Sequence, residues 1–298
     1  MSQKMYIATS STVKIFATGL KGLKTVQGIR AKTNDMVVII GRDSNVKNDY
    51  SNEIRQYCNA QGVFNYINSE SNEDRAFGLA IAAGWQRMIY DVPSSSLIVF
   101  HDSLLPRYRG FNPLVSALLN KDRHIGVTAL LASDKYDCGD IVCQRRIQIE
   151  HPILMQDAIE RISDIYFDLA GKIYELFIAN EVVGQPQNEI DATYSLWRDN
   201  EDYAIDWSDS SERIELQVNS LGFPYLGASC SVDGEHFRIK KVTLIDDVLI
   251  ENRTPGKIIF FDEDRPVVVC GIGLIRLDRI ENDDGVSYKI KKFRTRFK

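Results

Sequence analysis

The alternation of short apolar runs with longer helical stretches over the first 150 residues constrains the fold more than any other feature. Met36–Ile40 (MVVII) is a continuous apolar run of strand length, typical of a strand buried on both faces of a parallel sheet. Helices are expected at Ser11–Arg30 and Tyr50–Gln61. Further strands are expected at Lys4–Thr9, Val63–Ile67, Phe77–Ala83 and Ser96–Phe100. Strands that alternate with helices predict an open, mainly parallel α/β sheet.

The same pattern continues to about residue 150 and ends in a long helix. One helix and two strands are expected at Pro113–Leu119, Gly126–Ala132 and Ile141–Ile149. Over about 153–180, apolar residues recur every three or four positions, as on the buried face of a helix. The polar stretch that follows contains Gly and Pro and is typical of a linker. We therefore predict a Rossmann-like domain over residues 1–182 and a linker over 183–194.

The pattern of apolar and turn-forming residues changes after the linker. Short strand-like segments alternate with turn signals such as Asp233-Gly234 and Pro255-Gly256. The expected strands are Phe237–Val242, Lys257–Phe261, Pro266–Val269 and Gly273–Arg279. Residues 195–298 are therefore predicted to form a smaller, β-rich, barrel-like domain.

Charge, cysteine content and the length of apolar runs exclude several classes of protein. The net charge is −5, and residues 195–298 hold 16 Lys and Arg against 19 Asp and Glu, so we expect no nucleic-acid partner. The five cysteines are odd in number and widely spaced without a CxxC pair, which predicts neither disulfides nor a metal site. No run of 18 apolar residues exists, so a cytoplasmic protein without a membrane span is expected.

The densest unusual stretch is Phe100–Pro113 (FHDSLLPRYRGFNP). His101 directly follows an apolar run, and ligands of open α/β sheets gather beyond the carboxyl ends of strands. Histidine is suited to move a proton near neutral pH. By pattern alone, a single histidine after a strand is more often structural. Likewise, Arg107 and Arg109 alone are compatible with a solvated loop.

A second polar cluster, Asp134–Asp140 (DKYDCGD), follows another predicted strand. Asp137 or Asp140 could orient His101 and favour its protonated form. Ordinary turn chemistry explains three aspartates equally well. Magnesium is a further option for an oxygen-rich loop, but the phosphate-cradling glycines that usually accompany it are missing.

Together these stretches carry a resemblance to a known family. The run from His101 to Pro113 (H-x-S-L-L-P-x-Y-R-G-x-x-P) looks like the signature of formyltransferases that use N10-formyltetrahydrofolate. Gly126-Val127-Thr128 and Asp137-Cys138-Gly139-Asp140-Ile141 resemble the second signature. Stretches similar to the family's C-terminal domain are Ala204–Trp207, Gly222–Tyr225, Pro255–Ile258 and Gly273–Leu277. The resemblance covers about residues 75–280.

The resemblance implies roles for these residues. His101 matches the family's general acid/base, and Asp137 matches the aspartate that raises the histidine pKa. The donor N10-formyltetrahydrofolate is then expected along three segments, mostly through main-chain contacts. These segments hold Arg87, Met88 and Ile89, then Phe111, and then Ser133, Asp134, Lys135, Tyr136 and Asp137. No metal is implied.

One position departs from the family pattern. The family has Asn two residues before the histidine, where this chain has Val99, which cannot donate a hydrogen bond. Loss of one oxyanion donor typically costs about 10²–10³ in rate. Asn112 is the nearest substitute, although it could instead cap the helix that starts at Pro113. A non-catalytic folate or nucleotide-sugar binding protein is therefore one alternative.

The formyl acceptor is predicted from the branch of the family that the chain resembles most. Length, layout and the Arg109-Gly110-Phe111 region are similar to sugar N-formyltransferases, which act on nucleotide-linked amino sugars for surface polysaccharides such as lipopolysaccharide. That resemblance implies a TDP-, UDP- or GDP-linked dideoxy amino sugar, with Arg107, Arg109 and Tyr225 as substrate-binding candidates, and a homodimer. Methionyl-tRNA formyltransferase is the other alternative. Residues 41–75 receive no role.

Overall fold

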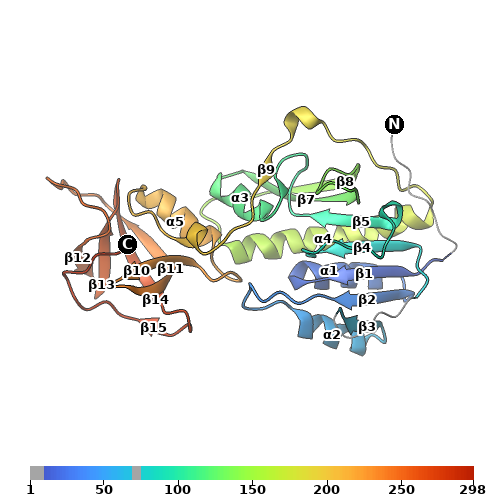
Figure 1. The fold of residues 1–298 in the computed structure, drawn as a ribbon, viewed down its shortest axis with the longest axis horizontal. Helices are drawn as coiled ribbons and strands as arrows, with labels where there is room; N and C mark the ends of the chain where they lie inside the picture. The colour runs from blue at the N-terminus through green and yellow to red at the C-terminus, as the bar shows by residue number, and fades with distance from the viewer. Residues whose placement is uncertain (1–9, 69–74) are drawn as a thin grey trace.

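A seven-stranded sheet organises the first half of the chain in a computed structural model that describes residues 10–68 and 75–298 (Figure 1). Five neighbouring strands run parallel, in the spatial order β3, β2, β1, β4, β5. Their bounds are β1 Val13–Ala17, β2 Met36–Ile40, β3 Phe64–Ile67, β4 Leu79–Ala83 and β5 Leu97–His101. Strands β7 (His124–Leu131) and β8 (Ile141–Gln148) extend the sheet antiparallel beyond β5. The mainly parallel α/β sheet is thus confirmed.

The two faces of this sheet are covered differently. Helices α1 (Gly19–Arg30) and α4 (Met155–Ile178) pack against each other and share one apolar core with the strands, and α2 (Ser51–Ala60) and α3 (Pro113–Leu119) contribute to the same core. The opposite face packs against the loop after β4 through Trp85, Ile89 and Val92. This second face carries the candidate site.

The first strand differs from the expectation. The helix expected over Ser11–Arg30 is wrong at its start, because Val13–Ala17 forms a strand at the centre of the parallel region, and the helix begins at Gly19. Alternate residues of β1 face the two sides of the sheet, so all five are buried. Even Lys14 is 5% exposed, with its ammonium 4.7 Å from the centre of the Phe77 ring. The strand expected at 4–9 lies outside the described residues.

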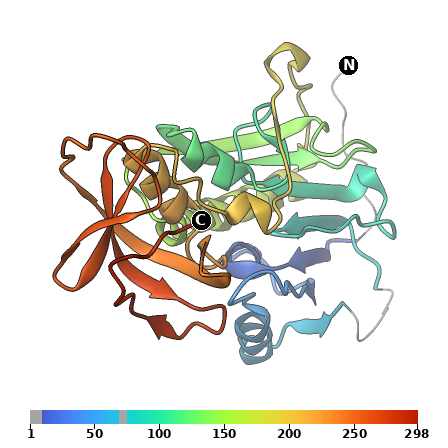
Figure 2. The same cartoon turned by 60° about the vertical axis from the view of Figure 1, so that its left-hand side comes forward.

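The second half of the chain forms an antiparallel sheet (Figure 2). Its strands are β10 Ala228–Val232, β11 Glu235–Ile245, β12 Ile258–Asp262, β13 Arg265–Val269, β14 Leu274–Glu281 and β15 Ser287–Tyr288. The C-terminal segment joins its two edges, because Lys298 exchanges backbone hydrogen bonds with Ser231 of β10, and Phe297 donates to Gly256 just before β12. This connection makes the unit barrel-like.

Helix α5 (Ser211–Ser220), which sequence reasoning missed, lies between the two sheets (Figure 1). Ile214 and Val218 belong to the core of the second sheet, whereas Leu216 belongs to the core of the first.

The domain boundaries 1–182, 183–194 and 195–298 stay a prediction. Within the described ranges, no helix is both long and apolar enough to cross a membrane.

Candidate active site

His101 is the last residue of β5 and lies on the sheet face opposite α4. Alternation along the strand turns Ile98 and Phe100 into the core shared with α4, whereas Leu97 and Val99 pack in the cluster on the other face. By the same two-residue period, His101 shares the face of Val99. The histidine is 7% exposed, so its ring is held in a buried position at the carboxyl end of a parallel strand.

Both ring nitrogens of His101 face oxygen atoms. Nε2 lies 2.8 Å from the carbonyl oxygen of Tyr108, and Nδ1 lies 3.4 Å from Oδ1 of Asp137. A carbonyl and a carboxylate are both acceptors, so only the doubly protonated ring satisfies both contacts at once. The neutral ring has a single N–H, and loss of either contact exposes one nitrogen for proton transfer. The predicted pair of His101 and Asp137 is therefore brought together.

The backbone around this pair is held in an uncommon conformation. Tyr108 and Asp137 have φ angles of 61° and 54°, in the left-handed region that non-glycine residues rarely adopt. Tyr108 supplies the carbonyl oxygen, and Asp137 the carboxylate, that face the ring of His101. The second carboxylate oxygen of Asp137 accepts the backbone N–H of Gly110 at 2.8 Å, which fixes the loop after β7 to the loop after β5.

Residues 185–195, which we call the strap, bind both of these loops. The side-chain amide of Gln187 donates to the carbonyl oxygens of Asp137 and Gly139, each at 2.7 Å. Farther along, Thr193 Oγ1 accepts the backbone N–H of Tyr108 at 2.9 Å. The strap strand β9 (Tyr194–Ser195) then pairs in parallel with β6 (Arg109–Gly110). The segment predicted as a linker therefore also supports the site, a role that its polar composition did not reveal.

The side chain of Arg109 forms hydrogen bonds with this strap. Its side chain is 1% exposed, and its guanidinium donates to Gln187 at 2.8 and 3.1 Å and to Glu189 at 2.7 and 2.8 Å. The hydrogen bonds to Glu189 raise the pKa of Arg109 despite burial, which lowers it. A guanidinium engaged in this way positions the Asp137 loop, so the structure places Arg109 behind the site. Its substrate-binding role stays a prediction.

Asp102, next to His101, anchors the other side of the strand end. Its carboxylate accepts hydrogen bonds from the Lys21 ammonium and from the Tyr166 hydroxyl. Burial lowers the pKa of Lys21, but the charge and hydrogen bond of Asp102 act together with the nearby Tyr225 and Asp43, so that the pKa is raised. Sequence reasoning missed this trio, because its members come from α1, from the residue after β5 and from α4, and no local motif joins them.

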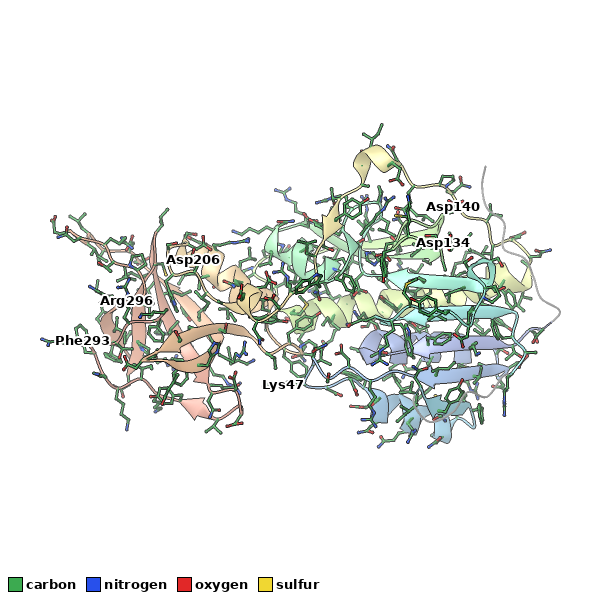
Figure 3. All side chains as sticks on the ribbon, in the orientation of Figure 1. Lys47, Asp134, Asp140, Asp206, Phe293 and Arg296 are labelled. Atoms are coloured by element: carbon green, nitrogen blue, oxygen red, sulfur yellow. The ribbon has the colours of Figure 1, made fainter. Side chains whose placement is uncertain are left out.

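The segments predicted to hold the folate flank Val99. The predicted folate residue Ile89, and Ala132 just before Ser133, pack in the same apolar cluster as Val99. Phe111 and Tyr136 are 42% and 60% exposed, with ring centres 6.1 Å apart. The other predicted folate residues are the exposed Arg87, Met88, Asp134 and Lys135 and the half-buried Ser133. Asp134 and Asp140 belong to the loop that joins β7 to β8 (Figure 3).

Asn112 lies at the N-cap position of α3 with a φ angle of 50°, and Pro113 follows at the first helical position. Its side chain makes no capping hydrogen bond, so the amide is not used in the way that the capping interpretation required. Val99 is partly buried within apolar neighbours and offers no donor.

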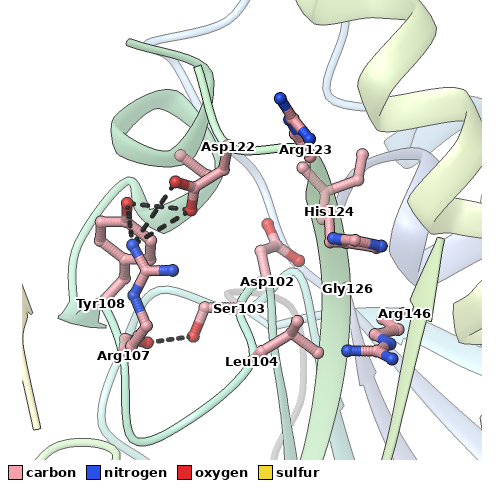
Figure 4. A pocket seen from close by; sticks show the side chains of 12 residues that line it. Asp102, Ser103, Leu104, Arg107, Tyr108, Asp122, Arg123, His124, Gly126 and Arg146 are labelled. Carbon is pink, nitrogen blue, oxygen red and sulfur yellow. Dashed lines mark hydrogen bonds and ion pairs between the residues drawn. The ribbon is translucent and has the colours of Figure 1, made fainter. Parts of the chain in front are cut away.

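The three predicted substrate residues do not share one cavity. Arg107 lines a cavity with Arg123, His124 and Arg146, and its guanidinium lies 3.3 Å from the carboxylate of Asp122 (Figure 4). Tyr225 lines a different cavity, at the loops after β1 and β2. Burial raises the pKa of the Tyr225 hydroxyl to about 12, while the nearby Lys21 lowers it.

Within the described ranges, no group of three or more His, Cys, Asp or Glu side chains could hold a metal ion.

Two family models match this chain in order. Residues 34–177 match the model described as formyl transferase, and residues 198–298 match the formyl transferase C-terminal domain. The chain belongs to the formyl transferase family. The resemblance that the motifs carried is thereby confirmed at the level of the family.

The chain is similar to several differently named proteins of known sequence or structure. A methionyl-tRNA formyltransferase from Geobacter sulfurreducens is 28% identical over 193 residues, which are 65% of this chain and 59% of that protein. An N-formyltransferase from Helicobacter canadensis, solved with folinic acid and dTDP-3-aminofucose, has a TM-score of 0.64 at 16% identity and covers 94% of this chain and 100% of its own. HypX from Aquifex aeolicus, solved with tetrahydrofolic acid, has a TM-score of 0.61 at 17% identity over 93% of this chain and 45% of its own. These two structures show that the fold is shared.

Proposed function

We propose that this protein transfers the formyl group of N10-formyltetrahydrofolate to the amine of a nucleotide-linked amino sugar. The observation that carries formyl transfer is the placement of His101 between the Tyr108 carbonyl and the Asp137 carboxylate, at a strand end inside a formyltransferase fold. A buried imidazole held by two acceptors can both release and regain a proton.

The reaction needs one nucleophilic attack and one proton relay. The lone pair of the acceptor amine attacks the formyl carbon, and the carbonyl π electrons move to oxygen to give a tetrahedral oxyanion. The amine then loses a proton, N10 of the folate gains one, and the bond from carbon to N10 breaks. Formamide and tetrahydrofolate result. His101 moves the proton, and the charge of Asp137 stabilises its protonated form.

The donor site is supported by the face of β5 next to His101. Val99 and its neighbours Ile89 and Ala132 form an apolar floor, with Phe111 and Tyr136 as exposed rings beside the Asp137 loop. A flat, partly apolar pteridine fits such surroundings, because aromatic faces favour stacked or edge contacts.

Asn112 is our candidate for the oxyanion donor that Val99 cannot supply. Its amide has no capping hydrogen bond, and it is separated by one residue from Gly110, whose N–H holds Asp137. A pre-positioned donor of this kind stabilises the charge that develops on the formyl oxygen.

The amino-sugar acceptor is supported by architecture and charge. The Helicobacter canadensis protein, solved with an amino sugar nucleotide, matches this chain over its full length, and the second half of this chain carries a net negative charge. A methionyl-tRNA acceptor is the second candidate, since sequence relatives such as the Geobacter sulfurreducens protein act on that substrate by name. A homodimer and a cytoplasmic location stay predictions.

A turnover assay tests the proposal. The full chain is supplied with N10-formyltetrahydrofolate and either TDP-, UDP- and GDP-linked 3-amino and 4-amino sugars or charged initiator tRNA, and release of tetrahydrofolate is followed with mass analysis of the acceptor. We expect formylation of one amino sugar. Formylation of the tRNA alone would overturn the acceptor. Folate binding without any turnover would make the protein a binding module, in line with Val99.

A further inference from the structure

One cavity near the site was not anticipated from the sequence. It is lined by Tyr108 and Asn120 on the α3 side and by Trp197 and Arg198 on the opposite side, and we call it the Trp197 cavity. No substrate role had been given to any of these four residues.

The cavity offers an uncovered aromatic surface. Trp197 is 63% exposed and its neighbour Tyr194 is 67% exposed, whereas Trp207 is 5% exposed in the core of the second sheet. Large aromatic rings bury much apolar surface when a ligand covers them, and they accept flat rings by stacking. An exposed indole on a cavity wall is therefore suited to a heterocyclic base.

Two arginines add positive charge to the same wall. Nε of Arg198 is buried and has no hydrogen-bond partner among the described residues, which leaves an unsatisfied donor at the cavity. Arg213 uses one guanidinium nitrogen for the carbonyl of Leu119 at 2.7 Å and keeps its other donors. One guanidinium group can donate two parallel N–H hydrogen bonds to the oxygens of a phosphate. Among the described lining residues, Asp202 is the single carboxylate.

The cavity adjoins the reacting centre through one residue. Tyr108 lines it, and the carbonyl oxygen of Tyr108 lies 2.8 Å from Nε2 of His101. Ser195, also in the lining, places its hydroxyl 3.5 Å from the same carbonyl oxygen. A ligand in this cavity therefore contacts the residue that orients the histidine.

Two further cavities of the described residues suit a nucleotide less well. The Tyr225 cavity is lined by the carboxylates Asp43, Asp49 and Glu160, which repel a diphosphate, and its Lys21 is already paired with Asp102. The cavity of Figure 4 has three arginines, but the carboxylates Asp102 and Asp122 also line it. Its one Phe, Tyr or Trp side chain, Tyr108, is 7% exposed.

We propose that the Trp197 cavity binds the nucleoside diphosphate of the acceptor, with the base on the indole of Trp197 and the phosphates on Arg198 and Arg213. This assignment rests on the proposed function in one respect, that the acceptor is a nucleotide-linked sugar. In this assignment Trp197, rather than the substrate-binding candidate Tyr225, contacts the base.

The test is calorimetric titration of the full chain with dTDP, UDP and GDP, without any formyl donor. The variants are Trp197→Leu and Arg198→Gln, and the matched control is Arg123→Gln, which removes an exposed arginine from the cavity of Figure 4. We expect one diphosphate to bind, its Kd to rise about tenfold or more in each cavity variant, and the control to stay within about twofold. Unchanged binding of folinic acid by all variants establishes that they are folded.

Three results would overturn the assignment. They are an unchanged Kd in both cavity variants, an equal rise in the control, and no binding of any diphosphate by the unmodified chain. The turnover assay separates this failure from failure of the proposed function. Formylation of an amino sugar with an unchanged KM in both variants removes the cavity but keeps the function, whereas diphosphate binding through Trp197 without amino-sugar turnover keeps the cavity and removes the function.

Discussion

The side-chain amide of Gln187 lies 2.7 Å from the carbonyl oxygen of Asp137, the residue whose carboxylate faces His101. Through this contact a segment some 50 residues farther along the chain fixes the loop that carries Asp137. Arg109 holds the other end of the same amide group, because its guanidinium donates to Oε1 of Gln187. The loops after β5 and β7 are thus set relative to each other by the half-buried side chain of Gln187.

Gln187→Ala is expected to lower kcat about tenfold to 100-fold with a smaller change in KM, because the Asp137 loop loses its anchor and small misplacements of catalytic groups are costly. Steady-state kinetics with the accepted amino sugar checks this. Gln185→Ala is the matched control, since Gln185 contacts Ile141 through its backbone and keeps that contact. Equal kinetics for the two variants would show that the amide does not position the loop.

His101→Ala is expected to remove about 10²–10⁴ of the rate, because general acid/base catalysis contributes about that much. Asp137→Asn should also lower kcat, since an amide cannot stabilise the protonated ring as a carboxylate does. Circular dichroism and folinic acid binding serve to verify that both variants fold. Near-normal turnover of His101→Ala would reject the proton relay.

Asn112→Ala is expected to lower kcat about 10²–10³-fold and to change KM less, if its amide supplies the oxyanion donor. The double variant Val99→Asn with Asn112→Ala provides a sharper comparison, because it returns a donor to the sheet face shared with His101. We expect partial recovery of kcat. A loss of stability in Asn112→Ala without a change in kcat would assign this residue to the helix start alone.

Part of this arrangement could be read from the sequence, and particular residues show why. Met36–Ile40 forms β2 as expected, because an uninterrupted apolar run leaves a strand in a parallel sheet as the simplest solution. A helix was expected over Val13–Ala17, because its apolar residues continue the helical spacing of Leu20, Leu23 and Val26. The burial of Lys14 beside the distant ring of Phe77 could not be foreseen. His101 and Asp137 were paired correctly by motif resemblance, and the structure brings them together.

Contacts between segments that are distant in the chain could not be predicted from the sequence. For Arg109 the substrate-binding role stays a prediction, whereas its burial and its bonds to Gln187 and Glu189 became visible only in the structure. Helix α5 was missed because its apolar side chains divide between two cores, so that no single apolar stripe marks it. Tertiary burial decided both cases.

Lys21→Met tests the buried pair behind His101 and its dependence on pH. Removal of one partner of a buried pair leaves the other charge unpaired, and because Lys21 and Asp102 keep 19% and 12% of their side chains exposed we expect a loss of up to about 3 kcal/mol in the free energy of unfolding at pH 7. The pKa of Lys21 is raised by folding, so its stabilisation is complete below the ordinary lysine value of 10.5 and is lost as pH rises through the folded value. The difference in stability between the unmodified chain and Lys21→Met should therefore shrink only in alkaline solution.

Urea unfolding from pH 7 to pH 11 measures this difference. Lys24→Met is the matched control on the same helix, because Lys24 pairs with Asp164, whose side chain is 71% exposed, and such surface pairs contribute about 1 kcal/mol or less. A difference for Lys21→Met no larger than that of Lys24→Met would mean that Asp102 keeps its place through Tyr166 alone. In that case kcat of Lys21→Met should equal that of the unmodified chain, since the strand end that carries His101 would be unmoved.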